Sequence, residues 1–106
     1  MAEFLDPFRG NLPDRVLNKG ELIRAIRQDI AAEEEATHLY TAQADATDNK
    51  LAKRVLLDIA DEERVHIGEF SRLLSILTEG EEDKFLAEGA QEVNEMAARK
   101  RRATSP

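Results

Sequence analysis

Residues 61–66 read Asp61-Glu62-Glu63-Arg64-Val65-His66 and lie inside a long segment with the hydrophobic periodicity of a helix. Glu63 and His66 are three residues apart, so on a helix both side chains project from the same face. At about 100° per residue, the rest of that face is apolar. The stripe consists of Ala52, Leu56, Ile59, Ala60, Glu63, His66, Ile67, Phe70, Leu74 and Leu77. A carboxylate and an imidazole in the middle of an apolar stripe are costly to bury without partners or a metal ion.

The preceding segment, from about Lys19 to Ala46, also has the hydrophobic periodicity of a helix. Asn18 followed by Glu21 matches a capping box and predicts where this helix begins. Its apolar stripe is interrupted by a single carboxylate, Glu33, while Glu34 and Glu35 rotate toward solvent. The stripe consists of Leu22, Ile26, Ile30, Glu33, Thr37, Tyr40 and Ala44.

A short connection, Thr47-Asp48-Asn49, separates the two segments. Thr47 or Asp48 is expected to cap the second helix, which should run from about Asn49 to Leu77 and end near Gly80. Because the connection is short, the two long helices should be antiparallel neighbours. The sequence therefore predicts an all-α fold built on a long helical hairpin.

The ends of the chain are less regular. Residues 1–17 hold Pro7, Pro13 and Gly10, and we interpret them as an extended arm. Its apolar side chains are expected to pack against the rest of its own chain or against a neighbouring chain. Residues 81 to about 98 have the pattern of a shorter, weaker helix. Residues 99–106, which begin with four basic residues, are expected to form a flexible tail. We expect one domain spanning residues 1–106.

Charge and composition limit the function. The 106 residues include 22 acidic and 15 basic ones, a net charge of −7, which disfavours nucleic acid and anionic membranes as partners. No cysteine is present, which excludes disulfides and cysteine-ligated iron centres. The N-terminus lacks the features of a signal peptide, and no stretch reaches the ~20 apolar residues of a membrane span. The expectation is a soluble cytoplasmic protein.

A two-helix hairpin is half of a four-helix bundle, so we expect two chains to pair. A di-iron carboxylate bundle takes a Glu from each of two helices and a Glu-x-x-His from each of the other two, and one chain supplies half of that set. We therefore predict that Glu33, Glu63 and His66 are metal ligands and catalytic residues. Tyr40 either hydrogen-bonds and orients a ligating carboxylate or is a plain core residue.

Two further side chains carry groups that can bind a metal ion. His38 lies about 140° from Glu33 around the first helix and is expected at the surface. Glu62 lies at the edge of the stripe and is expected to flank the site.

At these residues the chain resembles the ferritin-like superfamily, and most closely the encapsulated ferritins. The resemblance covers most of residues 7–96. It rests on Ala32-Glu33-Glu34-Glu35-Ala36-Thr37-His38-Leu39-Tyr40, Ile59-Ala60-Asp61-Glu62-Glu63-Arg64-Val65-His66-Ile67-Gly68-Glu69-Phe70, Pro7-Phe8-Arg9-Gly10-Asn11-Leu12-Pro13-Asp14-Arg15 and Glu21-Leu22-Ile23-Arg24-Ala25-Ile26-Arg27.

The resemblance implies hairpins that pair into a ferritin-like dimer with a ferroxidase centre at the subunit interface, and pairs that form a ring, typically a decamer. Such proteins sit inside an encapsulin shell, oxidise Fe²⁺ and leave the mineral to the shell. On this chain it implies Glu33, Glu63 and His66 as iron ligands, two irons per pair of chains, and Tyr40 beside them. The implied partners are further copies and the encapsulin shell protein, in a nanocompartment of the cytoplasm.

The chain departs from this pattern in two places. Some members have a tryptophan before the tyrosine and acidic residues that form an outer site where metal enters; here Leu39 and Ala32 occupy two of these positions, and Glu35 alone matches. The C-terminal tail also lacks a clear shell-docking peptide of the Leu/Gly/Ser/Leu type.

Two other functions remain open. One is a rubrerythrin-like peroxide scavenger with the same ligands, which would have no cysteine-based electron donor of its own. The other is an acidic helical oligomerisation or adaptor module, in which Glu33, Glu63 and His66 only form hydrogen bonds between chains.

Overall fold

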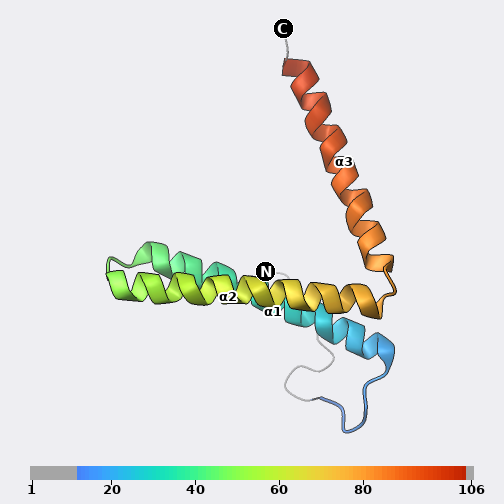
Figure 1. Ribbon diagram of the computed structural model, residues 1–106, viewed down its shortest axis with the longest axis horizontal. Helices are drawn as coiled ribbons and strands as arrows, with labels where there is room; N and C mark the ends of the chain where they lie inside the picture. Colours follow the sequence, from blue (N-terminus) through green and yellow to red (C-terminus); the bar gives the residue numbers. More distant parts are fainter. Residues whose placement is uncertain (1–11, 105–106) are drawn as a thin grey trace. The chain divides into compact units, whose positions relative to one another are not determined.

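The chain folds into three helices, seen here in a computed structural model that describes residues 12–104 and the side chains of residues 12–99. They are α1 (Lys19–Ala46), α2 (Lys50–Leu77) and α3 (Glu81–Thr104), as Figure 1 shows. The described residues contain no strand, so the all-α prediction is confirmed. The chain divides into two compact units, Met1–Leu74 and Ser75–Pro106. No helix within residues 12–104 combines the length and the apolar character that crossing a membrane requires.

The start of α1 is fixed by local hydrogen bonds. The side chain of Asn18 accepts from the backbone N–H of Glu21 at 2.8 Å, and the Glu21 carboxylate accepts from the backbone N–H of Asn18 at 3.0 Å. This is the capping box that the sequence predicted. The sequence did not predict Arg15, which donates two hydrogen bonds of 2.7 Å to the Glu21 carboxylate. These bonds tie residues 12–18, which are not helical, to the first turn of α1.

The Glu21 carboxylate is therefore held by several donors at once. The Arg15 guanidinium, followed by the backbone N–H of Asn18, lowers the pKa of Glu21 from its ordinary value of 4.5 to about 2. The same ion pair raises the pKa of Arg15. The carboxylate is ionised at neutral pH, as the capping box requires.

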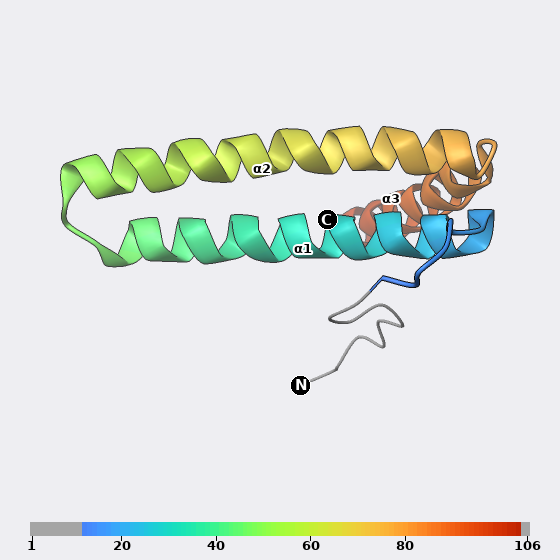
Figure 2. The same ribbon diagram turned by 90° about the horizontal axis from the view of Figure 1, so that it is seen from below.

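The two long helices form an antiparallel hairpin, which Figure 2 shows from the side. The connection occupies residues 47–49, as predicted, but the N-cap of α2 is Asn49 rather than Thr47 or Asp48. Its side chain accepts from the backbone N–H of Ala52 at 2.9 Å, and Thr47 instead accepts from the backbone N–H of Asn49 at 3.2 Å. The earlier residues cannot cap because the helix begins only at Lys50.

The hairpin buries few large side chains. Among the described residues, the buried apolar ones are Ile26 (6% exposed), Ala44 (1%), Ala60 (1%) and Leu74 (5%). All four belong to the predicted stripes, whose remaining members are mostly half-buried. Large apolar residues on the hairpin stay exposed, among them Leu51 at 69% and Val65 at 63%. Two helices can cover only one face of each other, which leaves apolar surface for a further partner.

The last residues of α2 and the whole of α3 belong to the second unit. Glu79 (φ 55°) and Gly80 (φ 82°) adopt left-handed conformations, and the Gly80 N–H donates to the carbonyl of Ser75 at 2.9 Å, an arrangement typical of a helix C-terminus. The Ser75 hydroxyl donates to the carboxylate of Asp83 at 2.7 Å, in the first turn of α3.

The predicted end of α3 was wrong. The helix begins at Glu81 as expected, but it continues past residue 98 to Thr104, through the basic run that we had assigned to a flexible tail. Lysine and arginine are good helix formers and are favoured near a helix C-terminus, where they face the negative end of the dipole. Residues 105–106 lie outside the described part, as do residues 1–11 of the predicted arm; its residues 12–17 have no regular structure, as expected.

Candidate metal centre

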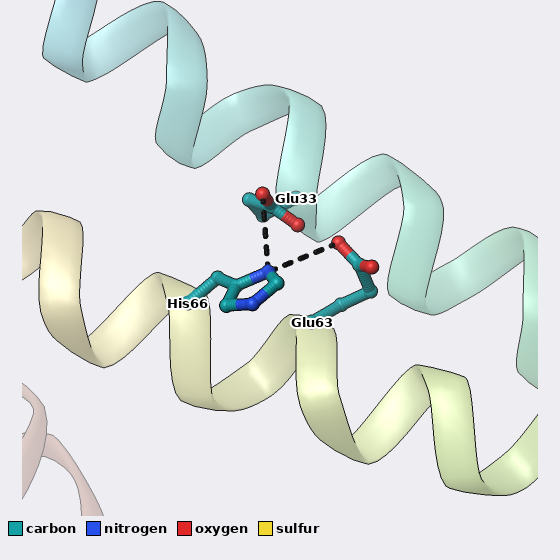
Figure 3. A group of neighbouring side chains, drawn as sticks. All are labelled: Glu33, Glu63 and His66. Carbon is teal, nitrogen blue, oxygen red and sulfur yellow. Dashed lines mark ion pairs between the residues drawn. The ribbon is translucent and has the colours of Figure 1, made fainter.

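Three side chains from two helices meet on the inner side of the hairpin (Figure 3). Glu33 comes from α1, whereas Glu63 and His66 come from α2. The Nδ1 atom of His66 lies 3.5 Å from Glu33 Oε1 and 3.7 Å from Glu63 Oε2. One ligand atom from each residue lies within 4.8 Å of the other two, a spacing suitable for metal binding. No other group of three such side chains was found in the part of the chain that the structure describes.

The helical repeat explains the convergence. Glu63 and His66 are one turn apart on α2 and point toward the same neighbour. Glu33 lies on the inner stripe of α1, and the antiparallel arrangement brings its turn opposite theirs (Figure 3). The structure thus brings together the three predicted site residues, although they are separated by up to 33 positions in the sequence.

The cluster is covered unevenly. The side chains of Glu33 and Glu63 are 20% and 19% exposed, whereas that of His66 is 47% exposed. The two carboxylates therefore lie between the helices, and the imidazole lies at the rim of the hairpin. The site is consequently open on the His66 side.

One atom of the cluster lacks a hydrogen-bond donor. Glu33 Oε2 is buried and has no hydrogen-bond partner among the described residues. A nearby hydroxyl, that of Thr37 one turn along α1, is used elsewhere because it donates to the backbone carbonyl of Glu33 at 2.8 Å. A buried carboxylate oxygen without a donor costs free energy, which a bound cation would recover.

The donor set fits a divalent transition metal. Carboxylates are hard anionic ligands that chelate one ion or bridge two, and imidazole is a common ligand of iron. The separations of 3.5 Å and 3.7 Å are longer than ordinary N–H···O hydrogen bonds, so the three residues do not satisfy one another. The residues present therefore suit iron.

The other side chains considered from the sequence lie outside the cluster. His38, Glu34 and Glu35 are exposed on α1, as predicted, and Glu62 is exposed on α2. Tyr40 is half-buried, and its hydroxyl makes no hydrogen bond to Glu33 or Glu63 within the described residues. Its role beside the site stays a prediction.

Comparison with known proteins shows the family to which the chain belongs. The sequence profile of the family described as rubrerythrin matches residues 25–104. An encapsulin nanocompartment cargo protein of Myxococcus xanthus is 44% identical over 72 residues, 68% of this chain and 55% of that protein. A ferritin-like–encapsulin shell fusion protein of Pyrococcus furiosus is 37% identical over 83 residues, 78% of this chain and 24% of that protein.

A solved structure is similar along nearly its whole length. The crystal structure of the encapsulated ferritin domain from Pyrococcus furiosus superposes with a TM-score of 0.78 and 33% sequence identity, covering 92% of this chain and 97% of that one. The chain spans about half of the first of the two sequence relatives and a quarter of the second.

Proposed function

Because this chain belongs to the rubrerythrin family of ferritin-like proteins and, within it, to the encapsulated ferritins, we propose that it is a ferroxidase. Its substrates are Fe²⁺ and dioxygen, and its site is a di-iron carboxylate centre shared between two chains. The observation that carries this proposal is the state of the Glu33 carboxylate: its Oε2 atom is buried without a donor among the described residues, and its Oε1 atom lies 3.5 Å from Nδ1 of His66 in the Glu-x-x-His pair. Such an atom is explained by a cation and is not explained by packing alone.

The number of ligands supports sharing between two chains. One chain offers two carboxylates and one imidazole, whereas two ions in a ferritin-like bundle take four carboxylates and two imidazoles. The open His66 side is where a second copy would complete the set.

The residues of this chain would act by binding and positioning the substrate. Glu33 and Glu63 supply negative charge that attracts Fe²⁺ and stabilises the more highly charged Fe³⁺ product. His66 would supply a neutral ligand to the iron. Two Fe²⁺ ions each give up one electron, and dioxygen takes both electrons and two protons to leave as hydrogen peroxide. Tyr40 would orient a ligating carboxylate by a hydrogen bond.

We further propose that the protein works inside an encapsulin compartment of the cytoplasm and passes oxidised iron to mineral stored there. Its similarity to a compartment cargo protein and to a ferritin-like–shell fusion protein supports this location. A homo-oligomer, with hairpin pairs arranged in a ring of ten chains, is the assembly we expect.

A second candidate is peroxide reduction by the same site, since the matching family profile is that of rubrerythrin. That reaction needs electrons, and the sequence holds no cysteine to ligate a built-in iron donor. Ferrous iron itself would then be the reductant. The same site would oxidise Fe²⁺ with either dioxygen or peroxide, each at its own rate. Comparing these rates ranks the two functions.

Native mass spectrometry with Fe²⁺ added under anaerobic conditions tests the proposal. We expect even-numbered assemblies that gain up to two irons per pair of chains. Glu33→Ala should lose this uptake and the subsequent oxidation by dioxygen, while Glu34→Ala, a change in the adjacent exposed carboxylate, should keep both. A stable oligomer that takes up no iron would refute the ferroxidase proposal and favour an adaptor module.

A further inference from the structure

The turn of α1 that follows Glu33 carries a side-chain hydrogen bond to the backbone of Glu33 itself. The hydroxyl of Thr37 donates to the backbone carbonyl of Glu33 at 2.8 Å. In an α-helix this carbonyl also accepts from the backbone N–H four residues later, which is that of Thr37. A single residue therefore bonds twice to the carbonyl of a candidate metal ligand.

Helix stability alone would not favour threonine at this position. Threonine is a poorer helix former than alanine or leucine, because its branched side chain loses freedom against the preceding turn. Thr37 is half-buried on the inner stripe of α1, where Leu22, Ile26 and Ile30 are apolar. A hydroxyl at such a position needs a hydrogen-bond partner, and that partner is the backbone of Glu33.

The bond bears on Glu33 in two ways. A threonine hydroxyl that donates to the carbonyl four residues earlier often bends the helix. A bend in the turn from Glu33 to Thr37 changes the direction in which the Glu33 side chain leaves the helix. The Thr37 hydroxyl also has a single O–H group to donate, and the backbone uses it. Glu33 Oε2 is accordingly left without a donor among the described residues.

Thr41 provides a comparison one turn further along α1. Its hydroxyl donates to the backbone carbonyl of Thr37 at 2.9 Å and to that of His38 at 3.0 Å. Thr37 and Thr41 are the two threonines of α1, and both are half-buried. They bond to the backbone in a similar way, but of the two it is Thr37 whose acceptor belongs to the candidate metal centre.

We propose that Thr37 is a positioning residue for Glu33. By bonding to the backbone of Glu33, it fixes the turn that carries this carboxylate and holds the carboxylate toward Glu63 and His66, where a divalent cation would bind. Thr37 acts through Glu33 and has no contact with the cation in this role. The inference rests on the proposed function, because it takes Glu33 to be a ligand. Loss of a residue that orients a ligand lowers metal affinity by about 10–100-fold.

Binding measurements on the full chain test the proposal. Thr37→Val keeps the branched shape and removes the hydroxyl, Thr37→Ser keeps the hydroxyl, and Thr41→Val removes the corresponding bond one turn away. Anaerobic equilibrium titration with Fe²⁺ measures binding without oxidation. We expect Thr37→Val to bind Fe²⁺ about tenfold more weakly than the wild type, and Thr37→Ser and Thr41→Val to stay within about twofold of it.

A fourth variant separates positioning from helix stability. Thr37→Ala also lacks the hydroxyl, but alanine is a better helix former than threonine. Thr37→Ala should therefore lose about as much affinity for Fe²⁺ as Thr37→Val while its helix content, measured by circular dichroism, is retained. It also keeps the test decisive if the valine variant folds poorly.

Several results would overturn the proposal. Equal losses of affinity in Thr37→Val and Thr41→Val would show a general effect on α1, and a Thr37→Ser variant as weak as Thr37→Val would show that the hydroxyl is not the cause. Wild-type affinity in Thr37→Ala would refute the role of Thr37 and leave the ferroxidase proposal intact. A wild type that bound no Fe²⁺ would refute both, so the two failures are distinguishable.

Discussion

The Nδ1 atom of His66 lies 3.5 Å from Glu33 Oε1 on the opposite helix, at about the distance that separates it from Glu63 on its own helix. The imidazole thus lies near both carboxylates, and Glu33 Oε2 has no hydrogen-bond donor among the described residues. Two carboxylates close together repel each other, and in the metal-free protein this repulsion opposes folding. On the proposed function, this cost in stability is the counterpart of the site's affinity for cations.

The metal-free protein should become more stable when the buried carboxylate is removed. Glu33→Leu keeps an apolar inner stripe and removes an oxygen that has no donor, so we expect a gain of about 1 kcal/mol in the free energy of unfolding. Urea denaturation in the presence of a chelator measures it. Glu34→Leu is the control, and because Glu34 is exposed it should bring no comparable gain. A strong loss of stability in Glu33→Leu would instead favour a structural role in hydrogen bonding.

Substitution of the two histidines should change the affinity for Fe²⁺ to very different extents. His66→Ala removes a proposed ligand and should weaken Fe²⁺ binding by roughly 100-fold, at least as much as the loss of a residue that supports a ligand. His38→Ala, at an exposed position on α1, should leave binding unchanged. Anaerobic equilibrium titration of both variants gives the comparison. Equal losses in the two variants would mean that His66 is not a ligand.

Tyr40→Phe should slow iron oxidation without changing the number of irons bound. Seven residues of helix separate Tyr40 from Glu33, about 10 Å along α1, so we expect its hydroxyl to reach a carboxylate of the partner chain. Removal of such a hydrogen bond typically costs 10–100-fold. Stopped-flow oxidation together with iron stoichiometry separates this role from a packing role, for which the rate would stay within about twofold of the wild type.

The Arg15–Glu21 pair should stabilise the fold in a pH-dependent way. The pKa of Glu21 is lowered in the folded chain to about 2 from an ordinary 4.5, so its contribution is fully present above pH 4.5 and is lost as the pH falls toward 2. Denaturation of the wild type and of Arg15→Ala at several pH values checks this. The stability difference between the two proteins should be constant near neutral pH and shrink below pH 4.5. A difference that does not change with pH would contradict the ion pair.

Local signals made most of the fold predictable. The Asn18–Glu21 capping box, the two apolar stripes and the short connection gave α1 its observed bounds and α2 its bounds to within one residue. Thr47, Asp48 and Asn49 are all residue types that can cap a helix, so the sequence alone did not identify Asn49 as the N-cap of α2. Arg15 was missed because its contact with Glu21 crosses an irregular segment, where no helical period relates the two residues.

The candidate site was predictable for the same reason. Glu33, Glu63 and His66 are polar residues on stripes that are otherwise apolar, and helical geometry then brings them together. The role of Tyr40 beside a ligating carboxylate stays a prediction, because helical spacing alone does not distinguish that role from a plain core position. The extension of α3 through the basic run was missed since a charged segment without apolar residues gives no periodic signal.

The half-exposed imidazole of His66 has a consequence for how the protein behaves at low abundance. A catalytic set divided between two chains makes activity follow mass action, so on the proposed function the rate per chain should fall on dilution below the dissociation constant of the pair. Free in the cell, a scarce chain would be mostly inactive. Confined with other copies in a small volume, it would experience a high effective concentration and stay paired. Enclosure would then act as a switch, restricting iron oxidation to the place where its product is kept.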